Sequence, residues 1–308
     1  MSLDKKQYLI GRLSLLTLTL IWGSSFSVLK LALNNTPTLY VMAFRFTGAA
    51  LLMLILGFRE MRSFTKRQFL MGALMGLCYF LAFFLQSSGL ARTTAGKNAF
   101  LTATYCVTVP FLFWLIKKRR PDRFNVLAAV ICIVGVGFIS MQNDFSIGLG
   151  EAITFAGSFF YALHIIVTAE VAKGENALMA TTIQFFVMAI LSWFFALATI
   201  PFPETIPSQT VFAIFYLCIM GTAVAFLLQL VGQRYTPPTP AAVIMSLESV
   251  FGTVISIIIY HDELSIKLVC GFVCVFAAIL ISELKPRFLL FGRKDKESEQ
   301  SQSEPALK

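Results

Sequence analysis

The sequence predicts an all-α polytopic membrane protein with ten transmembrane helices, arranged as two inverted five-helix repeats around a central cavity. Three observations predict this fold. Hydrophobic residues make up 57% of the 308 residues and charged residues 13%, a balance typical of a chain embedded in a bilayer. Ten apolar runs are long enough to span, and the last five repeat features of the first five. Because five is odd, the two copies would cross the membrane in opposite directions.

The apolar runs are bounded by Pro, Gly, Asn or charged residues, and about 20 residues of helix suffice to cross the hydrocarbon core. Short connections between the runs make neighbouring helices antiparallel. The expected helices cover residues 13–33, 38–58, 69–91, 97–116, 124–142, 148–171, 177–200, 209–231, 239–260 and 264–284.

The basic residues indicate which way the helices point. With the N-terminus inside, 20 of the 25 Lys and Arg residues fall in inner segments. Only Lys30, Arg92, Lys97 and Lys267 fall at or near the outer side. This bias predicts a multi-pass protein of the inner (cytoplasmic) membrane with both termini cytoplasmic. It also accounts for the net charge of +9, and no basic and aromatic cluster of the nucleic-acid-binding kind is present.

The internal repeat is visible as matched sequence at nearly constant spacing. It predicts four parts: a cytoplasmic N-terminus (1–12), a first five-helix repeat (13–142), a second, inverted repeat (148–284) and a disordered cytoplasmic tail (285–308). The matched pairs are Gln86–Gly89 with Gln229–Gly232 at a spacing of 143, residues 119–140 with 261–282 at 142, and Gly23–Phe26 with Gly157–Phe160 at 134.

Glu248 is a single acid near the middle of the apolar run Thr239–Tyr260. An ionisable group at that depth costs on the order of a few kcal/mol unless it faces a partner or water. Two interpretations follow. Glu248 is either a protonatable group or polar anchor that faces a pathway, or a packing acid held by neighbouring hydroxyls or by a basic residue such as Arg45.

Two other ionisable residues lie inside apolar runs. Arg45 either binds a substrate carboxylate or has a structural role, pairing with a carboxylate of the protein or reaching an interface. His164 shares a helix face with Tyr161, three residues earlier, and is either a proton relay or a hydrogen-bonded packing residue. No second His or Cys stands near His164 at ligand spacing, so neither a metal nor a cofactor is expected.

Aromatic and amide side chains at membrane depth are the remaining candidates. The aromatic residues either line a cavity for flat, partly apolar metabolites or make ordinary lipid and helix contacts. The amides are either interhelical hydrogen-bonding groups or donors to a substrate. Pro110 is expected to kink its helix. The candidates are Trp22, Tyr79, Phe83 and Tyr105 among the aromatics, and Gln86, Gln229 and Gln184 among the amides, with Asn98 and Ser246 ranked lower.

Several short motifs occur in an order that resembles the EamA-domain branch of the drug/metabolite transporter superfamily. They are Trp22–Phe26, Arg45 eight residues after Pro37, Ala91–Ala99 followed by Pro110, and Ser246-Leu247-Glu248 followed by Asp262–Ser265. The resemblance covers residues 13–285. It implies two inverted five-helix halves around a central cavity and the movement of small organic metabolites, often outward.

The resulting expectation is a secondary transporter, and more specifically an exporter of small organic metabolites such as amino acids, working by alternating access. No Walker-type phosphate loop is present, so ATP is not expected to drive it directly. A proton-coupled exporter of drugs or amphipathic cations is the alternative within this class. A membrane-embedded transferase or a scaffold is the alternative from another class. The expected partners are a small-molecule substrate and the lipid bilayer, with the protein a monomer or dimer.

Overall fold

The computed structural model describes residues 5–58, 65–118, 120–140, 148–171, 177–236 and 238–284. In this part of the chain all regular elements are helices and no strand occurs. The expected disordered tail, 285–308, lies outside the described residues. The elements are α1 (Lys5–Leu33), α2 (Thr38–Leu56), α3 (Lys66–Leu90), α4 (Ala95–Ala103), α5 (Tyr105–Lys117), α6 (Arg123–Ser140), α7 (Leu149–Val171), α8 (Ala177–Thr199), α9 (Ser208–Cys218), the π-helix η2 (Ile219–Val224), α10 (Ala225–Tyr235), α11 (Pro238–Tyr260) and α12 (Ile266–Leu284).

The helices have the length and surface of a polytopic membrane protein. Each of the ten expected ranges is helical. Seven helical stretches in the described residues are long and apolar enough to cross a membrane, and three further apolar helices, corresponding to α6, α11 and α12, are shorter there. Large apolar side chains cover the outer surface, for example Phe212 at 75% exposure and Ile133 at 68%. Lipid is the solvent that such a surface requires.

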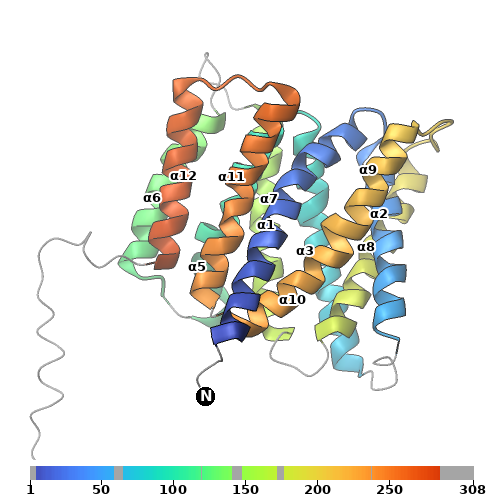
Figure 1. Ribbon diagram of the computed structural model, residues 1–308, viewed down its shortest axis with the longest axis horizontal. Helices are drawn as coiled ribbons and strands as arrows, with labels where there is room; N and C mark the ends of the chain where they lie inside the picture. The colour runs from blue at the N-terminus through green and yellow to red at the C-terminus, as the bar shows by residue number, and fades with distance from the viewer. Residues whose placement is uncertain are drawn as a thin grey trace, which may run out of the picture.

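The helices run side by side in one bundle (Figure 1). α6 packs against α12 at one end of its long axis, and α2 packs against α8 and α9 at the other. Between them, α1 packs along α10 and α11, and α7 packs along α3 and α4. The largest buried apolar cluster includes Phe46, Phe83, Phe185 and Phe226. It therefore joins α2 and α3 of the first half to α8 and α10 of the second.

Two helices depart from regular α-geometry. The helix expected at 97–116 is interrupted at Thr104, where backbone bonds run three residues back instead of four and the side-chain hydroxyl bonds to Leu101 O at 2.6 Å. A hydroxyl that bonds to the preceding turn competes with the helical ladder. Pro110 lies inside α5, where the kink expected from the sequence stays a prediction, and the interruption comes six residues earlier. The second irregularity is η2, between α9 and α10.

Glycines bring helices of the two halves into backbone contact. A Cβ atom at Gly89 of α3 would overlap Thr154 Oγ1 of α7 and lie 2.6 Å from the carbonyl oxygen of Gly150. A Cβ at Gly232 of α10 would lie 2.5 Å from Leu15 of α1. Only a residue without a side chain permits such an approach, which is the usual way that membrane helices pack closely.

Candidate functional site

Arg45 is buried in the middle of α2, with 3% of its surface exposed. Its Nε donates to Thr222 Oγ1 at 2.8 Å, and its Nη2 donates to the carbonyl oxygen of Gly221 at 3.2 Å. Both acceptors belong to η2, where the wider turn presents them to α2. The guanidinium also lies 4.7 Å from the ring centre of Phe83 and 5.4 Å from that of Phe46. Arg45 is therefore held by neutral groups and aromatic faces.

Tyr79 is the centre of an aromatic group that links α3 to α7 and α10. Its ring stacks on His164 with centres 4.8 Å apart, and its centre is 5.6 Å from Tyr161 and 5.9 Å from both Phe83 and Phe226. The expected pairing of Tyr161 and His164 on one face of their helix is thus visible, because both contact Tyr79.

Trp22 joins this aromatic group through α10. Its ring centre is 5.9 Å from that of Phe226, which in turn contacts Tyr79. Gln229, one turn further along α10, is half-buried and makes no hydrogen bond or ring contact with the other candidates in the described part of the chain. The structure therefore brings Trp22 to the site but does not join Gln229 to it.

Gln86 is the middle of a hydrogen-bonded chain between α3, α4 and α7. Tyr161 donates its hydroxyl to Gln86 Oε1 at 2.7 Å, and Gln86 Nε2 donates to Thr102 Oγ1 at 3.0 Å. Asn98 Nδ2 donates to the Gln86 carbonyl at 3.0 Å and to Thr154 Oγ1 at 2.7 Å. Gln86 thus links helices, and through Tyr161 it reaches the aromatic group.

His164 is buried and contacts another amide. Its Nε2 lies 2.8 Å from Gln184 Oε1 of α8 and 3.3 Å from Thr168 Oγ1. The Nε2 atom of Gln184 is fully buried without a hydrogen-bond partner among the described residues. One half of a buried amide is therefore unsatisfied beside His164, which is unusual because such groups are nearly always paired.

Glu248 is buried in α11, with 5% of its surface exposed, and accepts a hydrogen bond from the Tyr105 hydroxyl at 3.2 Å. The pairing with Arg45 considered from the sequence is wrong: in the described part of the chain Arg45 forms no ion pair with any carboxylate. Tyr79 and Tyr161 lie within electrostatic range of both Arg45 and Glu248. Arg45 and Glu248 thus both lie near Tyr79 and Tyr161, but they do not form an ion pair with each other.

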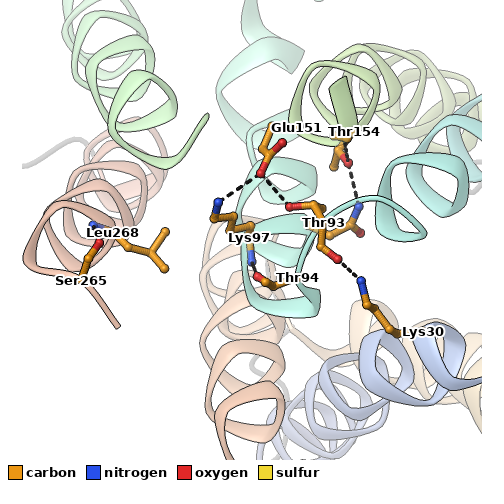
Figure 2. Close-up of polar contacts among 10 residues, drawn as sticks. Lys30, Thr93, Thr94, Lys97, Glu151, Thr154, Ser265 and Leu268 are labelled. Atoms are coloured by element: carbon orange, nitrogen blue, oxygen red, sulfur yellow. Dashed lines mark hydrogen bonds and ion pairs between the residues drawn. The ribbon is translucent and has the colours of Figure 1, made fainter. Parts of the chain in front are cut away.

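A second polar cluster lies where α1 and α3 end and α4 and α7 begin (Figure 2). Glu151, in the first turn of α7, accepts from Lys97 Nζ at 3.1 Å and from Thr93 Oγ1 at 2.8 Å. Lys30 Nζ donates to the carbonyl oxygens of Thr93 and of Leu90, the latter at 3.0 Å. Figure 2 shows Lys97 and Thr93 converging on the Glu151 carboxylate from one side. This cluster closes one end of the bundle.

Sequence reasoning missed some of these residues. Glu151 stands in the first turn of a helix, where the helix dipole favours an acid. That position explains the acid without a partner, so the sequence did not indicate the ion pair with Lys97. Thr222 and Gly221 carry no signal of their own, because a π-turn cannot be read from composition. Phe226 could have been found, since it stands 143 residues after Phe83.

Comparisons with known proteins agree with this architecture. The profile of the EamA-like transporter family matches the chain twice, over residues 9–141 and 148–284. An uncharacterized transporter from Archaeoglobus fulgidus is 31% identical over 276 residues, which is 89% of this chain and 86% of that protein. A protein of known crystal structure shares the fold at 15% identity, with a TM-score of 0.66 over 93% of this chain and 99% of its own. The chain belongs to the EamA-like transporter family.

Proposed function

We propose that this protein is a secondary transporter that exports small organic metabolites, such as amino acids, across the cytoplasmic membrane by alternating access. The observation that carries the proposal is the polar and aromatic site in the membrane interior. Arg45 of the first family-matched segment and Glu248 of the second flank Tyr79 and Tyr161 there. Charged groups at that depth are costly, and in membrane proteins they mark substrate and ion pathways.

The architecture we propose is ten transmembrane helices in two inverted five-helix repeats around a central cavity. Helix packing supports the inversion. α1 packs along α10 and α11, and its repeat mate α7 packs along α3 and α4. α2 with α8, and α6 with α12, pack as mates across the interface. This pattern is what a two-fold relation between the halves produces.

Contacts at the two ends of α1 support opposite orientations. Gly11 lies against Tyr235 and Thr236, where α10 ends, whereas Lys30 bonds to Leu90 and Thr93, where α3 ends. Gly11 and Lys30 are roughly 28 Å apart along one continuous helix. The ends of α3 and α10, which the 143-residue spacing makes equivalent, therefore lie on opposite sides of the bundle.

The close helix contacts also revise one repeat spacing. Gly89 meets Gly150 and Thr154, and its mate Gly232 meets Gly11 and Leu15, so α1 and α7 correspond at a spacing of 139. The spacing of 134 came from matching Gly23–Phe26 with Gly157–Phe160, and it differs from 139 by five residues. That match compared two short Gly-Ser sequences and did not consider which face of each helix packs against its neighbour. With the positive-inside bias, this arrangement supports cytoplasmic termini.

Glu248 gives a second candidate function specific support. A buried carboxylate whose hydrogen bond within the described part of the chain comes from a tyrosine hydroxyl can take up a proton or face a cation. Proton-coupled export of drugs or amphipathic cations is therefore the alternative. Competition between protons and a cationic solute at fixed external pH distinguishes it from metabolite export.

The test is efflux of radiolabelled amino acids from liposomes that contain the purified protein. The variant is Glu248→Gln, which keeps the shape of the side chain and removes its charge. Glu263→Gln, at an exposed position after α11, is the matched control. We expect efflux by the wild type and Glu263→Gln, and its loss in a Glu248→Gln protein that inserts and purifies normally. A broad panel of solutes that never crosses would contradict the transporter assignment.

A further inference from the structure

The charge of Arg45 has no opposite charge beside it. An arginine side chain stays protonated in proteins and carries five N–H donors, and burying it without a counter-charge costs several kcal/mol. Its bonds go to a hydroxyl and a carbonyl of η2 through Nε and Nη2. Nη1 makes no hydrogen bond among the described residues, and Lys97–Glu151 is the ion pair found in that part of the chain. The site is thus short of one negative charge.

Two further donors without acceptors lie next to it. The Tyr79 hydroxyl makes no hydrogen bond in the described part of the chain, although its ring is packed on five neighbouring rings. Gln184 Nε2 is fully buried and unpaired, on the amide that contacts His164. Tyr79 stacks on that same His164 and lies within electrostatic range of Arg45. Three donors without acceptors, on Arg45, Tyr79 and Gln184, are therefore connected through Tyr79 and His164.

The repeat relation explains why these donors converge. Arg45 and Gln184 stand 139 residues apart, the spacing at which α1 corresponds to α7. They occupy matching positions on α2 and α8, which pack against each other. Equivalent positions of two helices lie at equal distances from a two-fold axis between them, so each half contributes one buried polar side chain to this packed pair of helices.

We propose that Arg45, Tyr79 and Gln184 form an anion-binding subsite that takes the carboxylate of the transported solute. The planar guanidinium suits a carboxylate, and the Phe83 and Phe46 rings lie against it, with ring centres 4.7 and 5.4 Å from Cζ. The subsite rests on the proposed transport function, because without a moving solute nothing would supply the missing charge.

The test uses two series of solutes, and the members of each series share one side chain and differ at the amino and carboxyl groups. One contains L-phenylalanine, N-acetyl-L-phenylalanine and L-phenylalaninamide, and the other contains the corresponding leucine compounds. Efflux of each radiolabelled compound is measured from liposomes with the full-length wild-type protein, and subtracted from efflux without protein. We expect the carboxylate-bearing members to cross about ten times faster than the amides or more, since hydrogen bonds to charged groups carry that much discrimination.

Variants then assign the preference to the subsite. Arg45→Gln is expected to abolish the advantage of carboxylates over amides, and Arg45→Lys to retain part of it. Arg92→Gln, at an exposed arginine that bonds to Ser88 O, controls for the loss of a positive charge and should leave the preference unchanged. Tyr79→Phe removes one donor without touching charge, and should reduce the preference even where Arg45→Gln does not fold.

The two proposals fail in different ways. Amides that cross as fast as carboxylates in the wild type, or a folded Arg45→Gln protein that keeps the full preference, would overturn the subsite while leaving transport intact. If no compound of either series crosses above the protein-free rate, the metabolite-export proposal fails for this solute class, and the subsite fails with it.

Discussion

Replacing one glycine by alanine tests how closely the two halves of the bundle approach. A Cβ at position 89 would overlap Thr154 Oγ1, and it would also lie 2.6 Å from the Gly150 carbonyl oxygen and 3.0 Å from the Thr154 backbone nitrogen. Backbone atoms cannot rotate away, so α3 and α7 must separate. Overpacking of this kind costs about 1–3 kcal/mol. Because 1.4 kcal/mol is a factor of ten, Gly89→Ala should raise the unfolding equilibrium constant by roughly 5- to 150-fold.

Two other glycines complete the series. At Gly232 the nearest atoms are Cδ2 and Cγ of the Leu15 side chain, both at 2.5 Å, and the nearest backbone atom is 3.3 Å away, so Gly232→Ala should cost less than Gly89→Ala. At Gly137 a Cβ would meet nothing within 4 Å, so Gly137→Ala should leave stability unchanged or raise it by up to about 1 kcal/mol through helix propensity. Reversible unfolding of the purified proteins in mixed detergent micelles measures the three values. Equal stabilities for Gly89→Ala and Gly137→Ala would refute the packing described here.

Three further predictions concern topology and polar contacts. Epitope tags inserted at Arg120 and at Asp262 should be accessible from opposite sides of the membrane, and the same side for both would contradict the inverted repeat. Lys97→Met and Glu151→Gln should couple by about 1 kcal/mol in a double-mutant cycle of unfolding free energies, because Glu151 is buried while the Lys97 side chain keeps 29% exposure. If the two losses of stability simply add, the ion pair contributes nothing. Tyr105→Phe, which removes one hydrogen bond, should lower efflux by up to about tenfold, and unchanged efflux would exclude that bond from the transport cycle.

Periodic features of the chain were predictable from the sequence. Apolar runs of spanning length located most helix ends to within a few residues, because the bilayer sets a minimum length for a span, although α1 begins eight residues before the expected start and the ranges 97–116 and 209–231 are each divided. Glu248, Arg45 and His164 could be selected because an ionisable residue in such a run is rare. The aromatic candidates around Tyr79 were selected because they also lie at membrane depth, and the structure brings them together.

Contacts between distant helices were not predictable in the same way. A pairing of Arg45 with a carboxylate of the protein was one of the alternatives considered, and in the described residues Arg45 instead meets η2, whose carbonyl of Gly221 is presented by a local change in helix geometry. The interruption at Thr104 was not predicted, because its hydroxyl competes for a carbonyl one turn before it, whereas Pro110 lies inside α5 and its kink stays a prediction. At η2 and at Thr104 a local change in helix geometry, and not the apolar periodicity, decides the contacts.

The bond between Tyr105 and Glu248 joins positions 143 residues apart, the same spacing that relates the two copies of the repeat. In an assembly of two separate, identical five-helix chains, this position would face itself, as acid against acid or phenol against phenol. In one polypeptide the two family-matched segments carry different residues at these positions, so that a donor meets an acceptor. Two identical chains related by symmetry could not form this pair.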